Sequence, residues 1–345
     1  GRTVLIPGAE FKIFNLDTGA YVVQYTTYPS KVEHTSFFTD EDGNLILPET
    51  LPVGNYRIEE VTAPAGYVKN KDHVVIAVDT DTAYRVDEDT QEAVIEVEYV
   101  NTPTVGQLRI EKRGEVLKGF DKGMFLFQEM MLAGAKFEIY AAEDIYTADG
   151  QTDESGARTC YYRKGDLVTT LVTDADGQAV LAKLPLGTYR VVEVEAPYGY
   201  VAGAKEQLVT LAYADDEITV IYANLTVSNA YQKARVSVKK TDTKDGRMLA
   251  GAVLGLYAAE DILTDDGTVI VKKDVELGQA VTGDDGIAVF ALLLPSLLIS
   301  GTVTILMIPI AIIADTEREV LILARSSISC VIAPQSVPYG IFTQV

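Results

Sequence analysis

Short runs in which apolar and polar residues alternate recur along the chain, and they predict β-strands. Residues 8–14 (GAEFKIF) and 134–140 (GAKFEIY) alternate in this way, and residues 251–257 (GAVLGLY) begin with the same Gly-Ala pair. A period of two places successive side chains on opposite faces of a strand, so that one face is buried and the other faces solvent. No long run has the 3.6-residue period of a helix. The pattern therefore predicts an all-β fold.

An acidic turn follows each of these strands. The three turns are residues 39–43 (TDEDG), 173–177 (TDADG) and 282–286 (TGDDG). Asp40 and Asp174 invite a calcium interpretation, but the further acid at fixed spacing and the closing Glu of an EF-hand loop are absent. Asp and Gly are the residues that tight hairpin turns require, so we expect turns here and no metal site.

Two of the three copies continue in the same register. A second motif follows the acidic turn in each, LPVGNYRIEEVTAPAGY at residues 51–67 and LPLGTYRVVEVEAPYGY at residues 184–200. Both copies close with a β-rich run that ends in asparagine, at residues 94–101 and 218–229. Short strands separated by Gly, Pro and Asp turns predict a β-sandwich of about 100 residues for each copy.

The register divides the chain into four segments. Unit one comprises residues 1–103 and unit two residues 104–231. Unit three, residues 232–290, is a partial copy that loses the repeat near its end, and residues 291–345 form a tail of different composition. Because the connections between units are very short, we expect stacked sandwiches with little independent motion.

The net charge and the small number of Cys and His residues exclude several classes of function. The chain carries 50 Asp and Glu against 29 Lys and Arg, a formal charge of −21. Such an acidic chain repels phosphate backbones, which argues against nucleic acid as a partner. Its two cysteines, Cys160 and Cys330, and its two histidines offer neither a disulfide framework nor a zinc motif. With no phosphate-binding glycine loop or nucleophile elbow, we expect no cofactor, no metal and no enzyme with turnover.

The tail has three interpretations. It contains no Lys and no Asn, and residues 287–314 carry no charge, which is long enough to span a bilayer. A membrane anchor is the first interpretation, although Pro295 and Pro309 interrupt the run and acids follow it where bases are typical. A divergent end of unit three is the second. The third is a slip of the reading frame after about residue 290, which explains why Lys, Asn and the repeat disappear together.

At these residues the chain resembles the SpaA/Cna-B family of pilin-like and adhesin-stalk domains on Gram-positive cell surfaces. The resemblance covers about residues 1–290. It rests on the Gly-Ala-x-Phe-x-Ile-Tyr strand, the Asp-Gly turn and the motif Gly-x-Tyr-x-x-x-Glu-x-x-Ala-Pro-x-Gly-Tyr, which occurs twice. It implies tandem Ig-like or transthyretin-like β-sandwiches that serve as stalks or fibre shafts. It also implies a self-formed isopeptide bond between a lysine and an asparagine, assisted by a nearby glutamate.

The resemblance assigns a complete set of these residues to unit two. Lys112, at the end of the run Leu-Arg-Ile-Glu-Lys, matches the lysine of the first strand. Glu193 matches the assisting acid, and Asn229 matches the asparagine of the last strand. The resemblance therefore implies a Lys112–Asn229 isopeptide bond.

The sets in the other two units are partial. Glu60 and Asn101 match in unit one, but alignment with unit three puts the lysine six residues before Gly1, so we expect an amino-terminally truncated fragment. By strand alternation Glu59, the neighbour of Glu60, should face solvent. Lys240 matches in unit three, where the acid should fall within residues 303–310, which read VTILMIPI. Unit three should therefore not form the bond.

Burial explains why the reaction needs these residue types. An amine is normally protonated, and a carboxamide is a poor electrophile. Desolvation lowers the pKa of a lysine, so that the neutral amine becomes a nucleophile. It raises the pKa of a carboxyl, which can then hydrogen-bond the asparagine carbonyl and relay a proton to the departing ammonia. Folding supplies effective molarities of roughly 10⁵ M or more.

These points predict a structural function in an extracellular protein of the Gram-positive cell wall, with each bond made once and without turnover. The alternative is an adhesin module that binds a host protein or glycan through the insertions at residues 115–131 and 142–164. The resemblance implies a sortase and peptidoglycan as partners, reached through regions outside this chain. The run at residues 28–31 (YPSK) departs from the Tyr-Pro-Lys linkage motif by one inserted serine.

Overall fold

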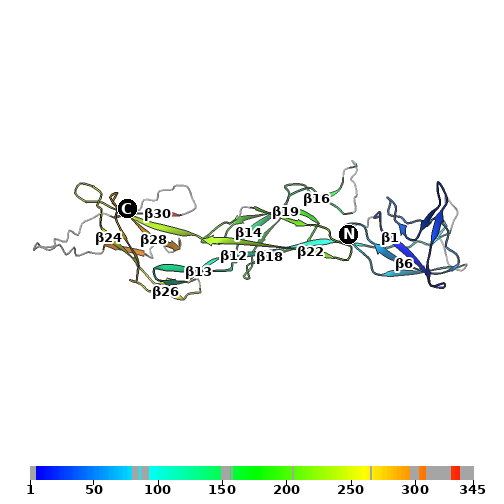
Figure 1. Cartoon of the computed structure of the whole chain (residues 1–345), viewed down its shortest axis with the longest axis horizontal. Helices are drawn as coiled ribbons and strands as arrows, with labels where there is room; N and C mark the ends of the chain where they lie inside the picture. Colours follow the sequence, from blue (N-terminus) through cyan, green and yellow to red (C-terminus); the bar gives the residue numbers. More distant parts are fainter. Residues whose placement is uncertain are drawn as a thin grey trace, which may run out of the picture.

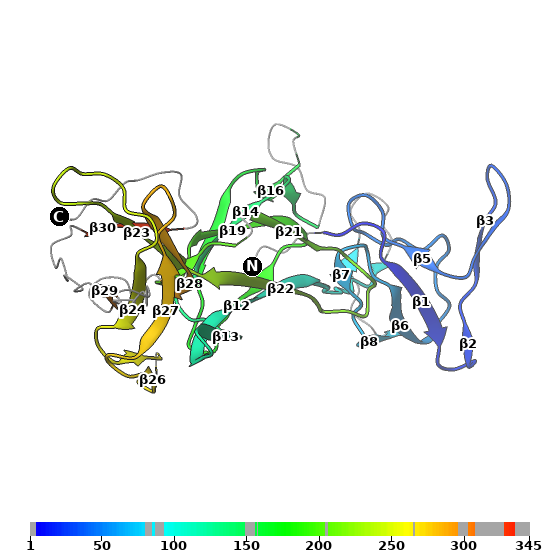
Figure 2. The same cartoon turned by 60° about the vertical axis from the view of Figure 1, so that its left-hand side comes forward.

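The three predicted units appear as three groups of strands along one long axis. The computed structural model describes residues 5–79, 85–86, 93–148, 156, 158–203, 206–264, 266–295, 303–307 and 328–334. Every regular element in these ranges is a β-strand. The groups follow chain order, from blue unit one through green unit two to unit three in yellow and orange (Figure 1; Figure 2). The predicted all-β class is confirmed.

Unit two is a complete sandwich of two sheets. Its strands are β12 (Val105–Asp121), β13 (Met124–Met131), β14 (Lys136–Ala141), β15 (Ile145–Tyr146), β16 (Cys160–Tyr162), β17 (Leu167–Val172), β18 (Gln178–Leu184), β19 (Gly187–Glu195), β20 (Tyr200–Val201), β21 (Glu206–Leu211) and β22 (Val220–Tyr231). One sheet has the order β13-β12-β22-β20, with β18 also paired to β12, and the other has the order β17-β14-β19-β21. β12 and β22 run parallel to each other.

Alternate side chains of the two sheets fill the core of unit two. Leu108 and Ile110 on β12 lie in one buried cluster with Val227 on β22, and Phe137 and Ile139 on β14 face them from the other sheet. Two sheets packed face to face through alternating inward residues are the arrangement of a β-sandwich. The period of two in the sequence therefore identifies the buried face correctly.

Unit one keeps one of these two sheets. Its strands are β1 (Glu10–Asn15), β2 (Ala20–Tyr21), β3 (Gln24–Thr26), β4 (Val32–His34), β5 (Phe37–Phe38), β6 (Gly54–Thr62), β7 (Tyr67–Val68), β8 (His73–Val78), β9 (Arg85–Val86), β10 (Ala93–Val94) and β11 (Thr102–Pro103). The sheet has the order β2-β1-β6-β8, with β5 also paired to β1. The remaining strands pair only two by two among the described residues, as β3 with β4, β7 with β11 and β9 with β10.

Unit three has two three-stranded sheets. Its strands are β23 (Lys233–Lys240), β24 (Val253–Ala258), β25 (Ile262–Leu263), β26 (Val269–Val271), β27 (Glu276–Val281), β28 (Ile287–Pro295), β29 (Val303–Met307) and β30 (Ile328–Pro334). The orders are β28-β23-β30 and β27-β24-β29, with β25 and β26 paired separately. β30 runs antiparallel to β23, whereas its counterpart β22 runs parallel to β12.

The described part of the predicted tail is built of strands. Residues 291–295 end β28, and β29 and β30 pair with strands of unit three. Residues 296–302, 308–327 and 335–345 lie outside the described residues. Within the described part of the chain, no helix is long and apolar enough to cross a membrane. The three interpretations of the tail stay open.

The three acidic segments form tight turns. Gly43, Gly177 and Gly286 have φ angles of 75°, 69° and 69°, which favour glycine. In the second turn the Asp174 carboxylate accepts hydrogen bonds from the backbone N–H groups of Asp176 and Gln178, at 3.0 and 2.9 Å. Across the residues that the structure describes, no group of three or more His, Cys, Asp or Glu side chains is arranged for a metal ion. The turn interpretation is confirmed.

The insertion after Lys112 is a β-hairpin that reaches from unit two onto unit three. β12 continues past Lys112 and pairs antiparallel with β13. We call residues 113–131 the hairpin arm. Its Leu117 and Phe125 belong to the same buried cluster as Val238 and Leu254 of unit three. One of the two insertions considered for ligand binding is therefore a packing element between units.

Ion pairs hold both junctions between units. At the junction of units two and three, Lys233 Nζ lies 2.8 Å from Glu115 Oε2 of the hairpin arm. At the junction of units one and two, the two oxygens of Glu217 lie 2.7 Å from Lys69 Nζ and 2.5 Å from Lys71 Nζ. These contacts agree with the expectation of closely stacked units.

Candidate cross-linking site

Strands β12, β19 and β22 bring the three predicted side chains of unit two together. Lys112 lies on the inward face of β12, two residues after the buried Ile110. β22 runs parallel beside β12, and Asn229 lies opposite Gly114, two residues past Lys112. Glu193 belongs to β19 in the facing sheet. The sandwich itself therefore assembles the site across its two layers.

The three side chains meet at one carboxylate oxygen. Lys112 Nζ lies 2.9 Å from Glu193 Oε1, and Asn229 Nδ2 donates a hydrogen bond of 2.8 Å to the same oxygen. The exposed fractions are 0% for Lys112, 3% for Asn229 and 9% for Glu193. The amine and the carboxamide thus each contact the same oxygen of the acid, away from water.

The Lys112 amine is buried without a well-directed hydrogen bond. Its Nζ is within ion-pair distance of Glu193 Oε1, but the contact lacks hydrogen-bond direction, so the nitrogen has no hydrogen-bond partner among the described atoms. The Phe137 ring centre lies 5.9 Å from Nζ. Burial lowers the pKa of Lys112 from its ordinary value, and the Glu193 carboxylate opposes this shift only in part. Burial thus makes the neutral, nucleophilic form of this amine easier to reach than in an exposed lysine.

A backbone amide that the sequence did not indicate holds the carbonyl of Asn229. The Gly203 N–H donates to Asn229 Oδ1 at 2.9 Å and lies 3.4 Å from Glu193 Oε2. The expectation that Glu193 bonds the asparagine carbonyl is therefore wrong, because Glu193 contacts the amide nitrogen and Gly203 contacts the oxygen. A Cβ at position 203 would lie 2.5 Å from Ser228 O, so glycine permits this approach.

These contacts fit one acyl transfer. An amine that attacks the Asn229 carbonyl carbon places negative charge on Oδ1, where the Gly203 N–H can stabilise it. Glu193 Oε1 lies within 3 Å of both nitrogens, the one that must lose a proton and the one that must gain it. The chain supplies each group that the reaction needs.

Unit one holds the acid and the asparagine of the same arrangement. Asn101 Nδ2 donates to both Glu60 oxygens, at 3.0 and 2.8 Å, and to Val68 O at 3.0 Å. The Asn70 N–H donates to Glu60 Oε2 at 2.6 Å. Burial raises the pKa of Glu60, although the hydrogen bonds from Asn70 and Asn101 oppose the shift. Glu60 is buried while Glu59 is partly exposed, as strand alternation predicts.

Unit three supplies only the lysine among its described residues. Lys240 is 1% exposed, at the end of β23. The expected position of the acid falls on β29, whose sequence VTILM contains none, and residues 308–310 lie outside the described residues. That unit three lacks a complete set stays a prediction.

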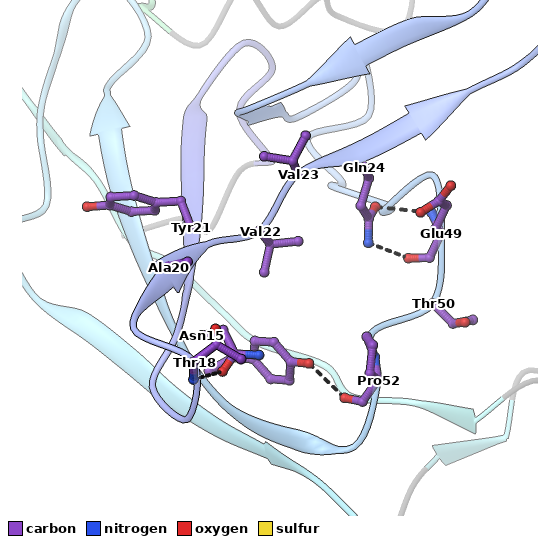
Figure 3. A pocket seen from close by; sticks show the side chains of 11 residues that line it. Asn15, Thr18, Ala20, Tyr21, Val22, Val23, Gln24, Glu49, Thr50 and Pro52 are labelled. Carbon is purple, nitrogen blue, oxygen red and sulfur yellow. Dashed lines mark hydrogen bonds between the residues drawn. The ribbon is translucent and has the colours of Figure 1, made fainter.

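A hollow of about 270 Å³ in unit one carries no comparable chemistry (Figure 3). Gln24 in its wall makes hydrogen bonds of 2.8 and 3.1 Å with the backbone of Glu49. The Tyr56 hydroxyl donates to Pro52 O at 2.8 Å, and Tyr189 of unit two makes the same corner contact with Pro185 O at 2.7 Å. These polar groups stabilise loops.

Comparisons with solved structures give matches of low sequence identity. Among solved structures, the TIE protein of Bacillus anthracis is 24% identical with a TM-score of 0.48, over 84% of this chain and 41% of that one. A streptococcal ancillary pilin is 18% identical with a TM-score of 0.26, over 89% of this chain and 90% of that one. The minor pilin GBS52 of Streptococcus agalactiae is 18% identical with a TM-score of 0.24, over 67% of this chain and 85% of that one.

This chain spans less than half the length of the TIE protein. A search of the curated proteins gives no match. The family model described as the SpaA prealbumin-like fold domain matches residues 2–110 and 128–226, which is more than half of the chain. The chain therefore belongs to the SpaA family of prealbumin-like fold domains.

Proposed function

We propose that this chain is part of a structural stalk of a Gram-positive surface protein, and that an amide bond between Lys112 and Asn229 locks its middle unit. The observation that carries the proposal is the buried group in which Lys112 Nζ and Asn229 Nδ2 contact the same oxygen of Glu193. Membership in a family of prealbumin-like domains supports a structural role. The described residues form strands, turns and junctions without a metal cluster.

The bond forms by loss of ammonia. The neutral Lys112 amine attacks Asn229 Cγ, while the Gly203 N–H stabilises the charge on Oδ1. Glu193 accepts a proton from the lysine nitrogen and delivers one to Asn229 Nδ2, so that the Cγ–Nδ2 bond breaks and ammonia leaves. No oxidant or cofactor is required, and each molecule reacts once.

The position of the bond suits a load-bearing role. Because β12 and β22 are parallel neighbours, the chain enters β12 at one end of the pair and leaves β22 at the other. Tension between these points loads the two strands in shear and passes through the Lys112–Asn229 bond. Residues 113–228 lie inside the closed loop and carry none of this load.

An extracellular, wall-attached location fits this chemistry. An amide is not broken by thiols, so the cross-link is independent of redox conditions, and Cys160 is a free thiol. We propose a sortase and peptidoglycan as partners of the whole protein, through regions outside this chain. For the alternative of a ligand-binding adhesin, Leu117 and Phe125 of the hairpin arm are buried against unit three, and the insertion at 142–164 is only partly described.

Stretching of single molecules tests the mechanical proposal. The full chain is held by its two ends and extended until its units unfold. With the bond, residues 113–228 stay inside the closed loop and do not lengthen the stretched chain. Without it, these residues, about 116 in number, add about 400 Å to the length of the unfolded chain, at about 3.4 Å each. We expect this increment in Lys112→Met and not in the native sequence.

Lys240→Met is the matched control, because it removes the corresponding buried lysine of unit three. In that unit the strand at the expected position of the assisting acid, β29, contains no Asp or Glu. This variant should extend like the native chain. An increment of about 400 Å in the native chain would contradict the proposal.

A further inference from the structure

Asn229 is the last residue of β22 that pairs with β12. The parallel ladder between the two strands ends with Asn229 opposite Gly114. The end of a strand opens more readily than its middle, because fewer hydrogen bonds hold it. The reaction proposed for unit two needs Asn229 Cγ held against the Lys112 amine, and a misplacement of about 1 Å can slow such a step by about a hundredfold. Contacts outside the ladder are therefore needed at this end of β22.

Two carboxylates of the hairpin arm contact β22 on either side of Asn229. On one side, the Ser228 hydroxyl donates a hydrogen bond of 2.9 Å to Glu129 Oε1. On the other side, the Tyr231 N–H donates one of 3.2 Å to Glu115 Oε2, so that a side chain continues the hydrogen bonding where the backbone ladder stops. The reactive asparagine therefore lies between two points of attachment to the arm.

The positions of these two carboxylates are unfavourable within the hairpin arm itself. Glu115 on β12 and Glu129 on β13 lie directly opposite each other in the antiparallel ladder. Like charges in this arrangement destabilise a sheet. Each carboxylate nevertheless has a donor in the stretch of β22 that flanks Asn229. A pair that destabilises the arm but holds both sides of the reactive residue points to a role at the site.

Unit three contacts one of the same carboxylates. Lys233, the first residue of β23, donates a hydrogen bond of 2.8 Å to Glu115 Oε2, the oxygen that also accepts from the Tyr231 N–H. The Lys233 Nζ also lies 4.3 Å from the centre of the Phe127 ring on β13. The first residue of unit three thus fixes the carboxylate that holds the end of β22.

The position of Lys233 depends on how unit three packs on the hairpin arm. Further along β23, Val236 and Val238 are buried in one cluster with Leu117 and Phe125 of the arm. β23 therefore contacts the arm both through its charged first residue and through its apolar middle. Packing of unit three and placement of the carboxylate beside β22 are linked through this one strand.

We propose that Glu115 and Glu129 are positioning residues for the Lys112–Asn229 reaction, and that packing of unit three on the hairpin arm accelerates this reaction by fixing Glu115 through Lys233. Both carboxylates act through the residues next to Asn229, which they hold where the amine can reach it. The inference rests on the cross-link proposed for unit two. It adds an order of events, in which the middle unit cross-links fastest once the next unit has folded onto the arm.

The rate at which the full chain loses ammonia during refolding tests this role. Each variant is isolated in denaturant at its full sequence mass, and intact-mass spectrometry follows the loss of about 17 Da after dilution into buffer. Glu129→Ala and Ser228→Ala remove one hydrogen bond from its two ends. Each should slow the reaction by about tenfold or more, and the double variant should be no slower than either single variant. Glu129→Gln keeps an oxygen that can accept the bond and should recover most of the rate.

The link to unit three has its own variant and a matched control. Lys233→Met removes the contact with Glu115 and should slow the reaction by about two- to fivefold, the range for a partly exposed ion pair. Lys69→Met is the control, because it removes an inter-unit ion pair of similar exposure, 2.7 Å from Glu217, at the opposite junction. This control should react at the native rate.

A pH profile separates positioning from a general loosening of unit two. The rate should rise with pH as the Lys112 amine loses its proton, and Glu193, the charged group that contacts this amine, is unchanged in every variant. Positioning variants should lower the plateau of the profile and keep its native midpoint. Exposure of the amine to water would instead move the midpoint upward, because burial lowers the pKa of Lys112.

Each result supports or overturns a defined part of the proposal. If Glu129→Ala and Ser228→Ala react within about twofold of the native rate, or if their midpoint moves upward, the positioning role is wrong. If Lys233→Met reacts as fast as Lys69→Met, the link to unit three is wrong. If the native chain keeps its full mass after refolding, the cross-link proposed for unit two is itself wrong, and the positioning role fails with it.

Discussion

Replacing Lys112 by methionine should release the largest stabilising constraint in unit two. The proposed bond would close a loop of 117 residues between Lys112 and Asn229. For a loop of this length, chain entropy in the unfolded state gives about 5 kcal/mol of stabilisation. Methionine removes the amine and fills similar space, but it also takes from the buried Glu193 its cationic partner. Glu193 keeps its hydrogen bond from Asn229 Nδ2.

Hydrogen exchange followed by mass spectrometry measures this loss within the full chain. The slowest amides of β14 and β19 report the opening of the unit-two core. A loss of about 5 kcal/mol corresponds to exchange faster by roughly three and a half orders of magnitude. Lys240→Met is the control and should leave β14 and β19 unchanged. If Lys112→Met accelerates the exchange of these amides by less than about tenfold, the cross-link does not contribute the expected stabilisation of unit two.

Four further predictions concern the reaction and the junction. Glu193→Gln keeps the shape of the side chain but cannot relay a proton, so the intact mass of this variant should equal its full sequence mass. Loss of ammonia from this variant would show that the acid is dispensable. Because the folded-state pKa of Lys112 is lowered, the unreacted folded state binds fewer protons than the unfolded chain between that pKa and about 10.5, so its stability rises with pH in this window. The same shift predicts that bond formation during refolding from denaturant accelerates as pH rises through the lowered pKa, and a rate independent of pH would contradict it. Phe125→Ala in the hairpin arm should destabilise unit three by about 3 kcal/mol, measured by exchange in β24, while Met124→Ala, at a site 60% exposed, should not.

The sequence could predict that the three side chains of the unit-two site lie close together, because each belongs to a recognisable strand motif. Lys112, Glu193 and Asn229 follow fixed registers relative to the Gly-Ala strand and the Gly-x-Tyr motif, and alternation turns all three inward. Their role as a set came from the family resemblance, since a single lysine or asparagine in a strand has no such meaning. Gly203 could not be predicted, because its contribution is a backbone N–H that any residue except proline carries.

Long-range packing explains what else the sequence did not reveal. The hairpin arm has a visible turn signal in Asp121, Lys122 and Gly123, but its apolar face packs on a core formed more than 100 residues later. No local pattern specifies that partner. The pairing of β29 and β30 with unit three matches only one of the three interpretations of the tail, and the sequence could not select it because the repeat motif ends before these strands.

Intact-mass spectrometry of the full chain tests the central claim most directly. The account predicts a mass about 17 Da below that of the sequence, and a branched peptide that joins Lys112 to Asn229 after digestion. A chain with the full sequence mass, in which Lys112 and Asn229 appear in separate unmodified peptides, would contradict it.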